Sequence, residues 1–271
     1  SAGKSVRRRR LSATSASLRI YVLPINKRKL PARKMDKISD YLCVDLETTG
    51  LNPKTDKIIE IGAVKVRGGK IADTFQTLVN PCRPLEERIT GITGITDDML
   101  SDKHVINEVL PDFLHFAGED ILLGHSVLFD YSFLKKAVVN GKGSFEREGL
   151  DTLKIARVYL TELPHRSLPY LCEHFGISHK AHRALGDAMA TVALYDKLWE
   201  LFSGKEGAEK YFQPHKLNYQ VKKDAPATAA QKERLYKLLE LHKITVEYSI
   251  EHLTRSEASR YTDQILAKYG R

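Results

Sequence analysis

Two acidic residues interrupt an apolar stretch near the start of the chain. Residues 41–47 have the apolar and β-branched composition of a short buried strand closed by a Thr-Gly turn, yet they include Asp45 and Glu47. Alternate strand residues project from one face, roughly 6–7 Å apart at the backbone, so these carboxylates lie side by side. Unless a cation neutralises them, repulsion and poor hydration raise their pKa values. Oxygen ligands favour Mg²⁺ or Mn²⁺ over zinc or copper; the simpler interpretation is a solvated strand end.

Two later sites carry side chains that could complete such a centre. Asp130 stands at a junction of strand, loop and helix, where an aspartate is often only a helix cap. His182 and Asp187 are five residues apart, which on a helix means about 140° of rotation. Both can therefore face one site only if His182 stands on the loop before the helix and Asp187 lies in its first turn. The alternative is an exposed histidine followed by an acid at a helix start.

Taken together, these motifs carry a resemblance to a known family. Asp-x-Glu-Thr-Thr-Gly-Leu at 45–51, Phe-Asp at 129–130 and His-x-x-x-x-Asp at 182–187 occur in this order, and the segments 58–63 and 93–96 also match family signatures. Over residues 38–202 the chain resembles the DEDDh 3′–5′ exonucleases, a ribonuclease H-like family. Among them it is similar to the proofreading epsilon subunit of bacterial DNA polymerase III and the exonuclease segment of PolC-type polymerases. One departure, His125-Ser126 in place of the common His-Asn, concerns a substrate contact and not the metal site.

The resemblance implies a role for each residue of the site. Asp45, Glu47, Asp130 and Asp187 would hold two Mg²⁺ or Mn²⁺ ions about 3.5–4 Å apart, with Asp45 bridging them. One ion would lower the pKa of a water, and the other would stabilise the leaving 3′-oxygen. His182, whose ordinary pKa lies near neutrality, would take the proton from that water. The residues implied to bind the 3′-terminal nucleotide are Thr48, Thr49, Gly50, Leu51, His125 and Phe129.

The elements that would position these residues follow from the hydrophobic pattern. Strands at 57–66 and 71–79, joined by a hairpin turn at 67–70, are expected to pair antiparallel. Thr96 or Asp97 could cap a short helix after the Gly- and Thr-rich segment 89–96. Further strands are expected at 121–125 and 150–152, the second leading into a helix that runs through residue 159. Other helices are expected at 105–116, 130–139, 168–175 and 185–202. This order predicts an α/β fold, a ribonuclease H-like mixed five-stranded sheet flanked by helices.

Charge is distributed unevenly along the 271 residues. The tail 1–34 contains eleven Lys and Arg and no Asp or Glu, whereas residues 35–224 carry a net charge of −4, although the whole chain is +9. The basic balance therefore belongs to the tail and does not indicate a basic nucleic-acid surface on the folded part. The three cysteines are far apart, which argues against a disulfide framework or a zinc site and fits a reducing cytoplasm. No apolar run approaches the roughly 20 residues of a membrane span, so no membrane association is expected.

Four segments are predicted along the chain. Residues 1–34 should be a disordered basic tail, and three interpretations compete for it: a nucleic-acid-binding arm, a targeting peptide, or sequence outside the working protein, with Met35 as a natural start. Residues 35–202 form the exonuclease domain, and 203–227 a linker. Residues 228–271 form a small helical module with capping boxes at Thr228 and Thr254. This module resembles helical domains appended to related exonucleases and is either a packing cap or a site for a strand or partner.

The functional hypothesis is a metal-dependent 3′–5′ exonuclease that hydrolyses nucleic acid, preferably single-stranded DNA 3′ ends, to nucleoside 5′-monophosphates. An RNA 3′-trimming exonuclease of the same fold is the alternative, because nothing in the sequence reads the 2′-hydroxyl. A catalytically idle nucleic-acid-binding module is the alternative of another class, and the intact set of four acids and a histidine argues against it. Proofreading, repair and recycling stay open, and with them a DNA polymerase or another replication or repair protein as a partner.

Overall fold

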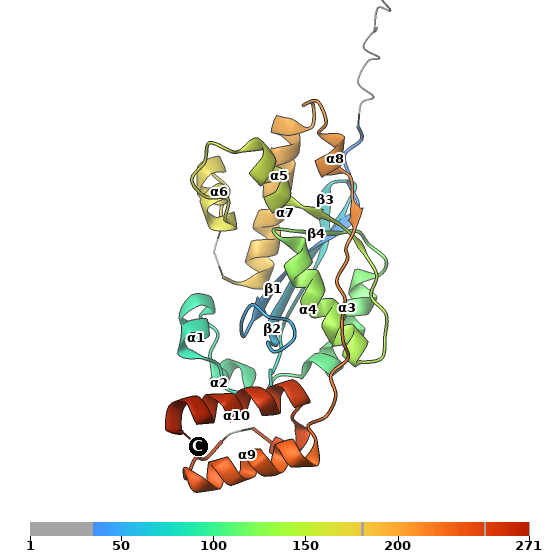
Figure 1. Cartoon of the computed structure of the whole chain (residues 1–271). Helices are drawn as coiled ribbons and strands as arrows, with labels where there is room; N and C mark the ends of the chain where they lie inside the picture. The colour runs from blue at the N-terminus through green and yellow to red at the C-terminus, as the bar shows by residue number, and fades with distance from the viewer. Residues whose placement is uncertain (1–34, 180–181, 247, 271) are drawn as a thin grey trace, which may run out of the picture. The chain divides into compact units, whose positions relative to one another are not determined.

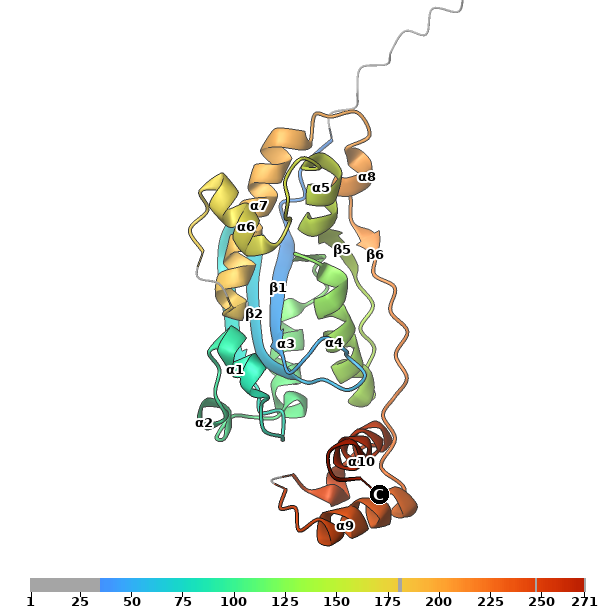
Figure 2. The ribbon, with the colours of Figure 1, turned by 60° about the vertical axis from the view of Figure 1, so that its left-hand side comes forward.

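Six strands form one mixed sheet in the computed structural model, which describes residues 35–179, 182–246 and 248–270. Their spatial order is β3-β2-β1-β4-β5-β6. The strands are β1 Tyr41–Thr48, β2 Ile58–Arg67, β3 Lys70–Leu78, β4 Leu122–Gly124, β5 Glu148–Asp151 and β6 His215–Lys216; Figure 1 labels β1 to β4, and Figure 2 labels β5 and β6. The predicted number of five strands was one short, because the two-residue β6 pairs antiparallel with the edge of β5. The predicted disorder of residues 1–34 falls outside the described residues.

The strand β1 occupies the middle of the sheet. It pairs antiparallel with β2 and parallel with β4, and β2 pairs antiparallel with β3 through the predicted hairpin, which is confirmed. The side chains of β1 alternate between two cores, since Tyr41 and Cys43 join one hydrophobic cluster while Leu42 and Val44 join the other. Asp45 and Glu47 therefore continue the face of Tyr41 and Cys43.

Helices cover both faces of the sheet (Figures 1 and 2). The cluster on the Cys43 face includes side chains of α5, α6, α7 and α8, and the cluster on the Val44 face includes side chains of α3 and α4. The helices are α1 Glu87–Thr93, α2 Asp97–Leu100, α3 Ile106–Ala117, α4 Val127–Asn140, α5 Thr152–Tyr159, α6 Leu168–Phe175, α7 Ala184–Phe202, α8 Glu209–Phe212, α9 Ala229–Leu241 and α10 Arg255–Tyr269, with a 3₁₀ turn at Ile250–His252. This α/β arrangement confirms the predicted mixed sheet with flanking helices.

Several helix boundaries follow the predicted caps. Thr96 accepts a hydrogen bond from the backbone N–H of Met99 and so caps α2. The helix α6 has the predicted bounds, and α4 begins three residues before its predicted start at 130. The sequence interpretation missed α1, because its two Thr and one Gly have low helix propensity. Gly94, with a φ of 69°, ends that helix in the left-handed conformation that favours glycine.

The C-terminal helices α9 and α10 share a small hydrophobic cluster of their own. Leu235 and Leu239 of α9 pack in it with Ala258 and Ile265 of α10. Both predicted capping boxes are present, from Thr228 to Gln231 and from Thr254 to Glu257. The segment predicted as a linker contains α8 and β6, and residues 35–271 form one compact unit. A separate module at 228–271 therefore stays a prediction.

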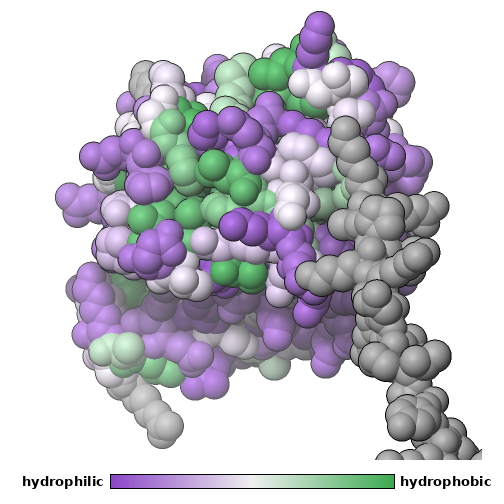
Figure 3. Space-filling model, turned by 90° about the horizontal axis from the view of Figure 1, so that it is seen from above, coloured by the Kyte–Doolittle hydropathy of each residue, from purple (hydrophilic) through white to green (hydrophobic). Residues whose placement is uncertain are grey.

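None of the described helices combines the length and the apolar character that crossing a bilayer requires. On the face seen in Figure 3, hydrophobic side chains are interspersed with hydrophilic ones. Leu51, at 79% exposure, is the most exposed large hydrophobic residue among those described, and it is the last residue of the segment Asp-x-Glu-Thr-Thr-Gly-Leu.

Candidate active site

Asp45 and Glu47 project from one face of β1, as the strand periodicity predicts. Both side chains are half-buried, whereas Val44 and Leu46 between and beside them are buried in the opposite core. Asp45 lies opposite Gly62 of β2, and Glu47 lies opposite Glu60. The two acids therefore stand at the carboxyl end of the central strand, with a glycine beside one of them.

Gly62 allows the helix α7 to approach the strand pair closely. A Cβ atom on this residue would lie 2.1 Å from the backbone carbon of Ala184 and 2.1 Å from the backbone nitrogen of Leu185. No side chain fits into such a gap, because contacts below about 3 Å lie inside the van der Waals radii. The first turn of α7, which carries Asp187, is thus held directly over Asp45 and Glu47.

Three of the predicted acids meet in one cluster. One carboxylate oxygen each from Asp45, Glu47 and Asp187 lie within 4.8 Å of one another. Asp130 enters from the opposite side of the sheet, in the first turn of α4, and its Oδ1 accepts a hydrogen bond of 3.1 Å from the backbone N–H of Leu46. This carboxylate is 4% exposed and lies beside, not within, the cluster of three.

Burial and repulsion between carboxylates raise the pKa values of Asp45, Glu47 and Asp130. For Asp45, burial is the largest cause and the charges of Asp130 and Asp187 add to it, so its pKa lies well above the ordinary value. Burial, together with the charges of Asp187 and Glu60, raises the pKa of Glu47 to about 7, although the nearby Arg183 opposes the shift. Burial also raises the pKa of Asp130, against the effect of its backbone hydrogen bonds. Without a cation the cluster is therefore electrostatically unfavourable.

This donor set fits hard divalent cations. It consists of carboxylate oxygens only, which suit Mg²⁺ or Mn²⁺, and among the described residues no Lys or Arg forms an ion pair with Asp45, Glu47 or Asp130. Positive charge supplied by a ligand would therefore relieve the repulsion that raises the pKa values. Asp45, Glu47 and Asp187 are the residues that would hold a first ion, and Asp130 borders the same space.

Two histidines precede Asp187, and only one of them contacts it. His182 lies on the loop before α7, as required for it to reach the site, but its side chain is exposed and its φ is 64°. His179 is buried instead, and its Nε2 lies 2.5 Å from Oδ1 of Asp187. Sequence reasoning missed His179, although the spacing His-x-x-His just before the motif was a visible signal.

A fully buried glutamate fixes the start of α7. Glu60 accepts hydrogen bonds from the Arg183 side chain, at 2.8 to 3.2 Å, and from the backbone N–H of Ala184 at 3.1 Å. Gln76 on β3 donates a further bond of 2.8 Å to the same carboxylate. The segment between His182 and Asp187 is thus anchored to β2. Segment 58–63, which contains Glu60, matched a family signature in the sequence, but sequence reasoning assigned Glu60 no role.

The predicted nucleotide-binding residues after β1 form a tight turn. The Thr48 hydroxyl donates to the carbonyl of Gly50 at 2.7 Å, and the Thr49 hydroxyl accepts from the backbone N–H of Lys57 at 3.0 Å and from the Arg83 guanidinium. Both threonines are buried, while Leu51 is exposed to solvent. The turn after the acids thus ends in one exposed apolar side chain.

The side chains of His125 and Phe129 both contact other residues of the chain. The His125 ring lies 2.9 Å from the Thr152 hydroxyl and 2.8 Å from the carbonyl oxygen of Arg166, so both nitrogens are engaged, and burial lowers the pKa of the ring. Phe129 packs against Phe133, with ring centroids 5.0 Å apart. A substrate contact by either residue stays a prediction.

The sheet order and the acids at the end of its central strand give the ribonuclease H-like architecture. The family model described as RNase_T, Exonuclease, matches residues 42–195, which include the four acids and His182. The chain therefore belongs to this exonuclease family, in its DEDDh group.

Relatives place the chain more closely within the family. It is 37% identical over 228 residues to the DNA polymerase III PolC-type of Thermotoga maritima and 36% identical over 255 residues to that of Bacillus subtilis. These stretches cover 80% and 87% of this chain but only 16% and 17% of the relatives, so the chain spans under a fifth of their length. The DNA polymerase III subunit epsilon of Aquifex aeolicus is 38% identical over 179 residues, covering 65% of this chain and 89% of that protein.

Solved structures show the same fold. Exonuclease X in complex with 5′ overhanging duplex DNA is 28% identical, with a TM-score of 0.50, and the match covers 64% of this chain and 97% of that one. The structure of exonuclease I is 21% identical, with a TM-score of 0.53 over 60% of this chain and 41% of that one. At this identity the second likeness concerns the fold alone.

Proposed function

We propose that this chain is a metal-dependent 3′–5′ exonuclease that acts on single-stranded DNA 3′ ends and releases nucleoside 5′-monophosphates. The observation that carries the proposal is the gathering of Asp45, Glu47 and Asp187 within 4.8 Å, with Asp130 adjoining; the pKa values of Asp45, Glu47 and Asp130 are raised. Phosphodiester hydrolysis needs stabilisation of negative charge on the phosphate and on the leaving oxygen, and a carboxylate cluster of this kind supplies it by holding cations.

The four acids would hold two Mg²⁺ or Mn²⁺ ions, which supply an acidified water and a Lewis acid for the leaving 3′-oxygen. The protein's own contribution is orientation. Gly62 and the Glu60–Arg183 contact fix Asp187 over β1, and the backbone N–H of Leu46 orients Asp130. These contacts pre-organise the acids, so that binding ions does not require rebuilding the site.

His182 is proposed as the general base. Its loop position, its exposure and the absence of a side-chain hydrogen bond to any other described residue leave its ring nitrogens available to accept a proton. His179 serves a different purpose, because its ring is buried against Asp187 and orients that carboxylate. The proposal therefore separates a positioning histidine from a proton-accepting one.

Leu51, Thr48, Thr49 and Gly50 are proposed to receive the terminal nucleotide, because they directly follow the acids and include one exposed apolar side chain. DNA is favoured as substrate because the relatives described above are named as DNA polymerase III proteins, and Exonuclease X was solved in complex with 5′ overhanging duplex DNA. A DNA polymerase or another replication or repair protein is the corresponding candidate partner.

Digestion of matched DNA and RNA oligonucleotides in Mg²⁺ and in Mn²⁺ tests the proposal, with the 3′ end of each strand either free or blocked by a phosphate. We expect stepwise shortening of 5′-labelled DNA from a free 3′ end, release of 5′-monophosphates, and no shortening after chelation with EDTA. Preferential shortening of RNA would establish the trimming alternative. Absence of hydrolysis with either metal would establish the idle binding module.

A further inference from the structure

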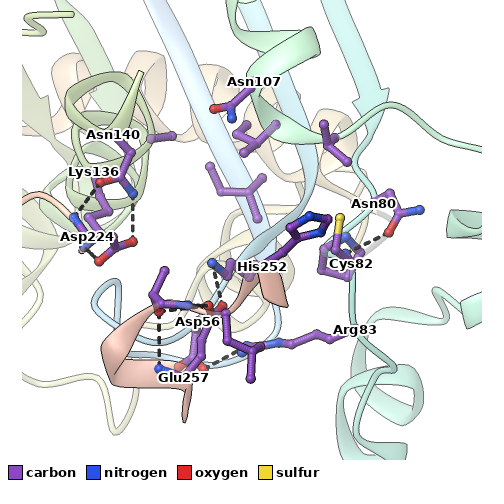
Figure 4. Close-up of a pocket in the computed structure, with 18 of the residues that line it drawn as sticks. Asp56, Asn80, Cys82, Arg83, Asn107, Lys136, Asn140, Asp224, His252 and Glu257 are labelled. Carbon is purple, nitrogen blue, oxygen red and sulfur yellow. Dashed lines mark hydrogen bonds and ion pairs between the residues drawn. The ribbon is translucent and has the colours of Figure 1, made fainter. Parts of the chain in front are cut away.

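Two cavities meet beside the turn that follows the catalytic strand. The smaller one, about 140 Å³, is lined by Thr49 of that turn and by Arg260 of α10. The larger one, about 390 Å³, lies between the β1–β2 loop, α3, α4 and the C-terminal residues 248–261 (Figure 4). Both cavities share the side chains of Arg83, Tyr248 and Tyr261 as lining. They therefore form neighbouring compartments that lead away from the proposed nucleotide-binding turn.

The smaller cavity contains a cationic side chain with unused donors. The Arg260 guanidinium lies over the Tyr261 ring at 5.0 Å and only 3.8 Å from Oδ1 of Asp56, a carboxylate that also pairs with Arg83 at 3.3 Å. The Arg260 side chain forms no hydrogen bond with another described residue, and its Nε is buried without a partner among them. Arginine offers five N–H donors in a planar fork that matches phosphate oxygens. The exposed Glu86 also lines this cavity and offsets part of its positive charge. Recognition of a phosphate here would therefore depend on the geometry of the guanidinium donors more than on net positive charge.

The larger cavity has the opposite character. Most of its charged groups already form ion pairs, Lys57 with Glu257 at 2.8 Å and Lys136 with Asp224. Lys54, which is exposed, also lines the cavity and has no ion pair with another described residue. The Asn107 amide and the His252 imidazole, which Figure 4 shows at the cavity, have no side-chain hydrogen bonds to other described residues. The remaining lining is largely apolar, with Ile58, Val105, Ile106, Phe133 and Leu253. Neutral donors and acceptors over an apolar floor suit a heterocyclic base better than an anion.

A preformed aromatic pair separates the two compartments. The rings of Tyr248 and Tyr261 are stacked, with centroids 4.1 Å apart and planes within 10°. Single-stranded nucleic acid is held by aromatic side chains on which bases stack and by cations that follow the backbone. The same combination is present next to Thr49, where an arginine, two tyrosines and a base-sized cavity follow one another in space.

We propose that the C-terminal helical segment forms an upstream subsite for the DNA strand, in which Arg260 binds a phosphate and the 390 Å³ cavity receives a base 5′ of the terminal nucleotide. This inference rests on the proposed function, since it assumes that the strand end lies at Thr48–Leu51. It assigns the segment a role in strand binding rather than in packing alone. The subsite lengthens the contact with a single strand and makes affinity depend on strand length.

Two variants test the subsite in the full chain. Arg260→Gln removes the proposed phosphate contact, and Asn107→Trp fills the larger cavity at a position without a side-chain hydrogen bond to described residues. Lys237→Gln is the control with the same loss of charge, because Lys237 lies on α9, pairs with no described residue except Glu233 and lines neither cavity. Thermal unfolding of each variant is measured to confirm that it folds.

Binding of a fluorescent single-stranded DNA is measured by anisotropy in EDTA over a series of salt concentrations. We expect Arg260→Gln and Asn107→Trp to weaken binding by roughly tenfold. For Arg260→Gln the slope of log affinity against log salt should also fall by about 0.7, the value for one lost phosphate contact on a single strand. A purely structural role of Arg260 would not change this slope. Wild-type affinity or an unchanged slope for a folded Arg260→Gln protein overturns the inference.

Hydrolysis separates failure of the subsite from failure of the enzyme. The ratio of kcat/KM for a long single strand to kcat/KM for the 4-nitrophenyl ester of thymidine 5′-monophosphate should fall roughly tenfold in both variants, mainly through KM for the strand. An unchanged ratio would contradict the subsite. If wild-type protein hydrolyses neither substrate, the exonuclease assignment fails, whereas the anisotropy result still decides the subsite by itself.

Discussion

Two groups of partly or fully buried carboxylates in this molecule have opposite surroundings. At the candidate active site, Asp45, Glu47 and Asp130 have no ion pair with a Lys or Arg of the described chain, and their pKa values are raised. At the junction with the C-terminal helices, Glu257 pairs with Lys57 at 2.8 Å. Burial alone would raise the pKa of Glu257, but the Lys57 charge and the Thr254 capping bonds outweigh it, and the pKa is lowered.

The difference shows that burial of an acid does not by itself indicate function. At the junction, Glu257 is neutralised by Lys57 of the same chain, so this ion pair stabilises the packing of α10 on the β1–β2 loop. The cluster at the end of β1 has uncompensated charge, which costs stability unless a ligand supplies the opposite charge. This contrast leads to four predictions, from the largest expected effect to the smallest.

The largest effect is expected at Asp45. Asp45→Asn should lower hydrolysis of 5′-labelled DNA by at least roughly a hundredfold, because it removes the ligand shared by the cluster. The same change should raise the Tm of the metal-free protein by relieving repulsion, and added Mg²⁺ should stabilise the wild type more than the variant. Asp112→Asn, an exposed aspartate on α3, should change neither property. Equal activity of Asp45→Asn and wild type would refute the site.

The two histidines near Asp187 should separate in kinetics and stability. His182→Ala should lower kcat by roughly a hundredfold or more with little change in Tm, as expected for a proton acceptor on an exposed loop. His179→Ala should lower the free energy of unfolding by about 1–3 kcal/mol, because Oδ1 of the buried Asp187 loses its His179 partner and only Oδ2 keeps a donor among the described residues, the backbone N–H of Arg183. If His179→Ala alone abolished hydrolysis while retaining Tm, the proposed roles would be reversed.

The closeness of the acids should depend on Gly62. In Gly62→Ala the new Cβ would overlap the backbone at Ala184 and Leu185, so α7 must shift away from β2. We expect a loss of roughly 1–3 kcal/mol in unfolding free energy and a Tm lower by several degrees, together with weaker stabilisation by Mn²⁺. Gly91→Ala provides the matched control, since Gly91 lies in α1 with open space around its Cβ position. Equal Mn²⁺ stabilisation in Gly62→Ala and wild type would disconnect α7 from the metal site.

The smallest expected effect is on the pH dependence of stability, which should have opposite signs for the acids at the end of β1 and for Glu257. The pKa of Glu47 in the folded protein is about 7 against an ordinary 4.5, so the folded state holds a proton that the unfolded state has lost between these values. The metal-free protein should therefore lose stability as pH rises through this window, by roughly 2–4 °C in Tm. Glu257, whose pKa is lowered, contributes with the opposite sign, and its stabilisation is lost as pH falls.

Melting curves in EDTA from about pH 4.5 to about pH 7 measure this effect. Glu47→Gln should reduce the decline, whereas Glu173→Gln, an exposed glutamate on α6, should leave it unchanged. A Tm that does not decline over this range would show that the acids are neutralised within the chain after all.

Sequence periodicity predicted the central strand, the hairpin between β2 and β3 and the capped helices, because these elements are encoded locally by alternation and cap residues. It missed α1, whose helix depends on packing Ile89 against β2 residue Ile59 rather than on propensity. It missed β6 because two residues have no period to read.

For the site, the motifs indicated which residue types could act together, but not how closely they meet. The contact of His179 with Asp187 and the anchoring of Arg183 by Glu60 join residues 8 and 123 positions apart in the chain. Local pattern carries no information on the second of these. The close approach at Gly62 was equally invisible, because only the packed structure shows which glycine lies beneath a helix.

Cys82, on the wall of the larger cavity, gives the molecule a selective chemical handle. Cys43 and Cys172 are 0% and 1% exposed, and burial raises the pKa of both thiols, to about 11 for Cys172. Cys82 is exposed, so a maleimide dye added to the folded protein should attach there alone, since only an accessible thiolate reacts. The unmodified sequence thus already provides a fluorescent reporter position beside the proposed path of the strand.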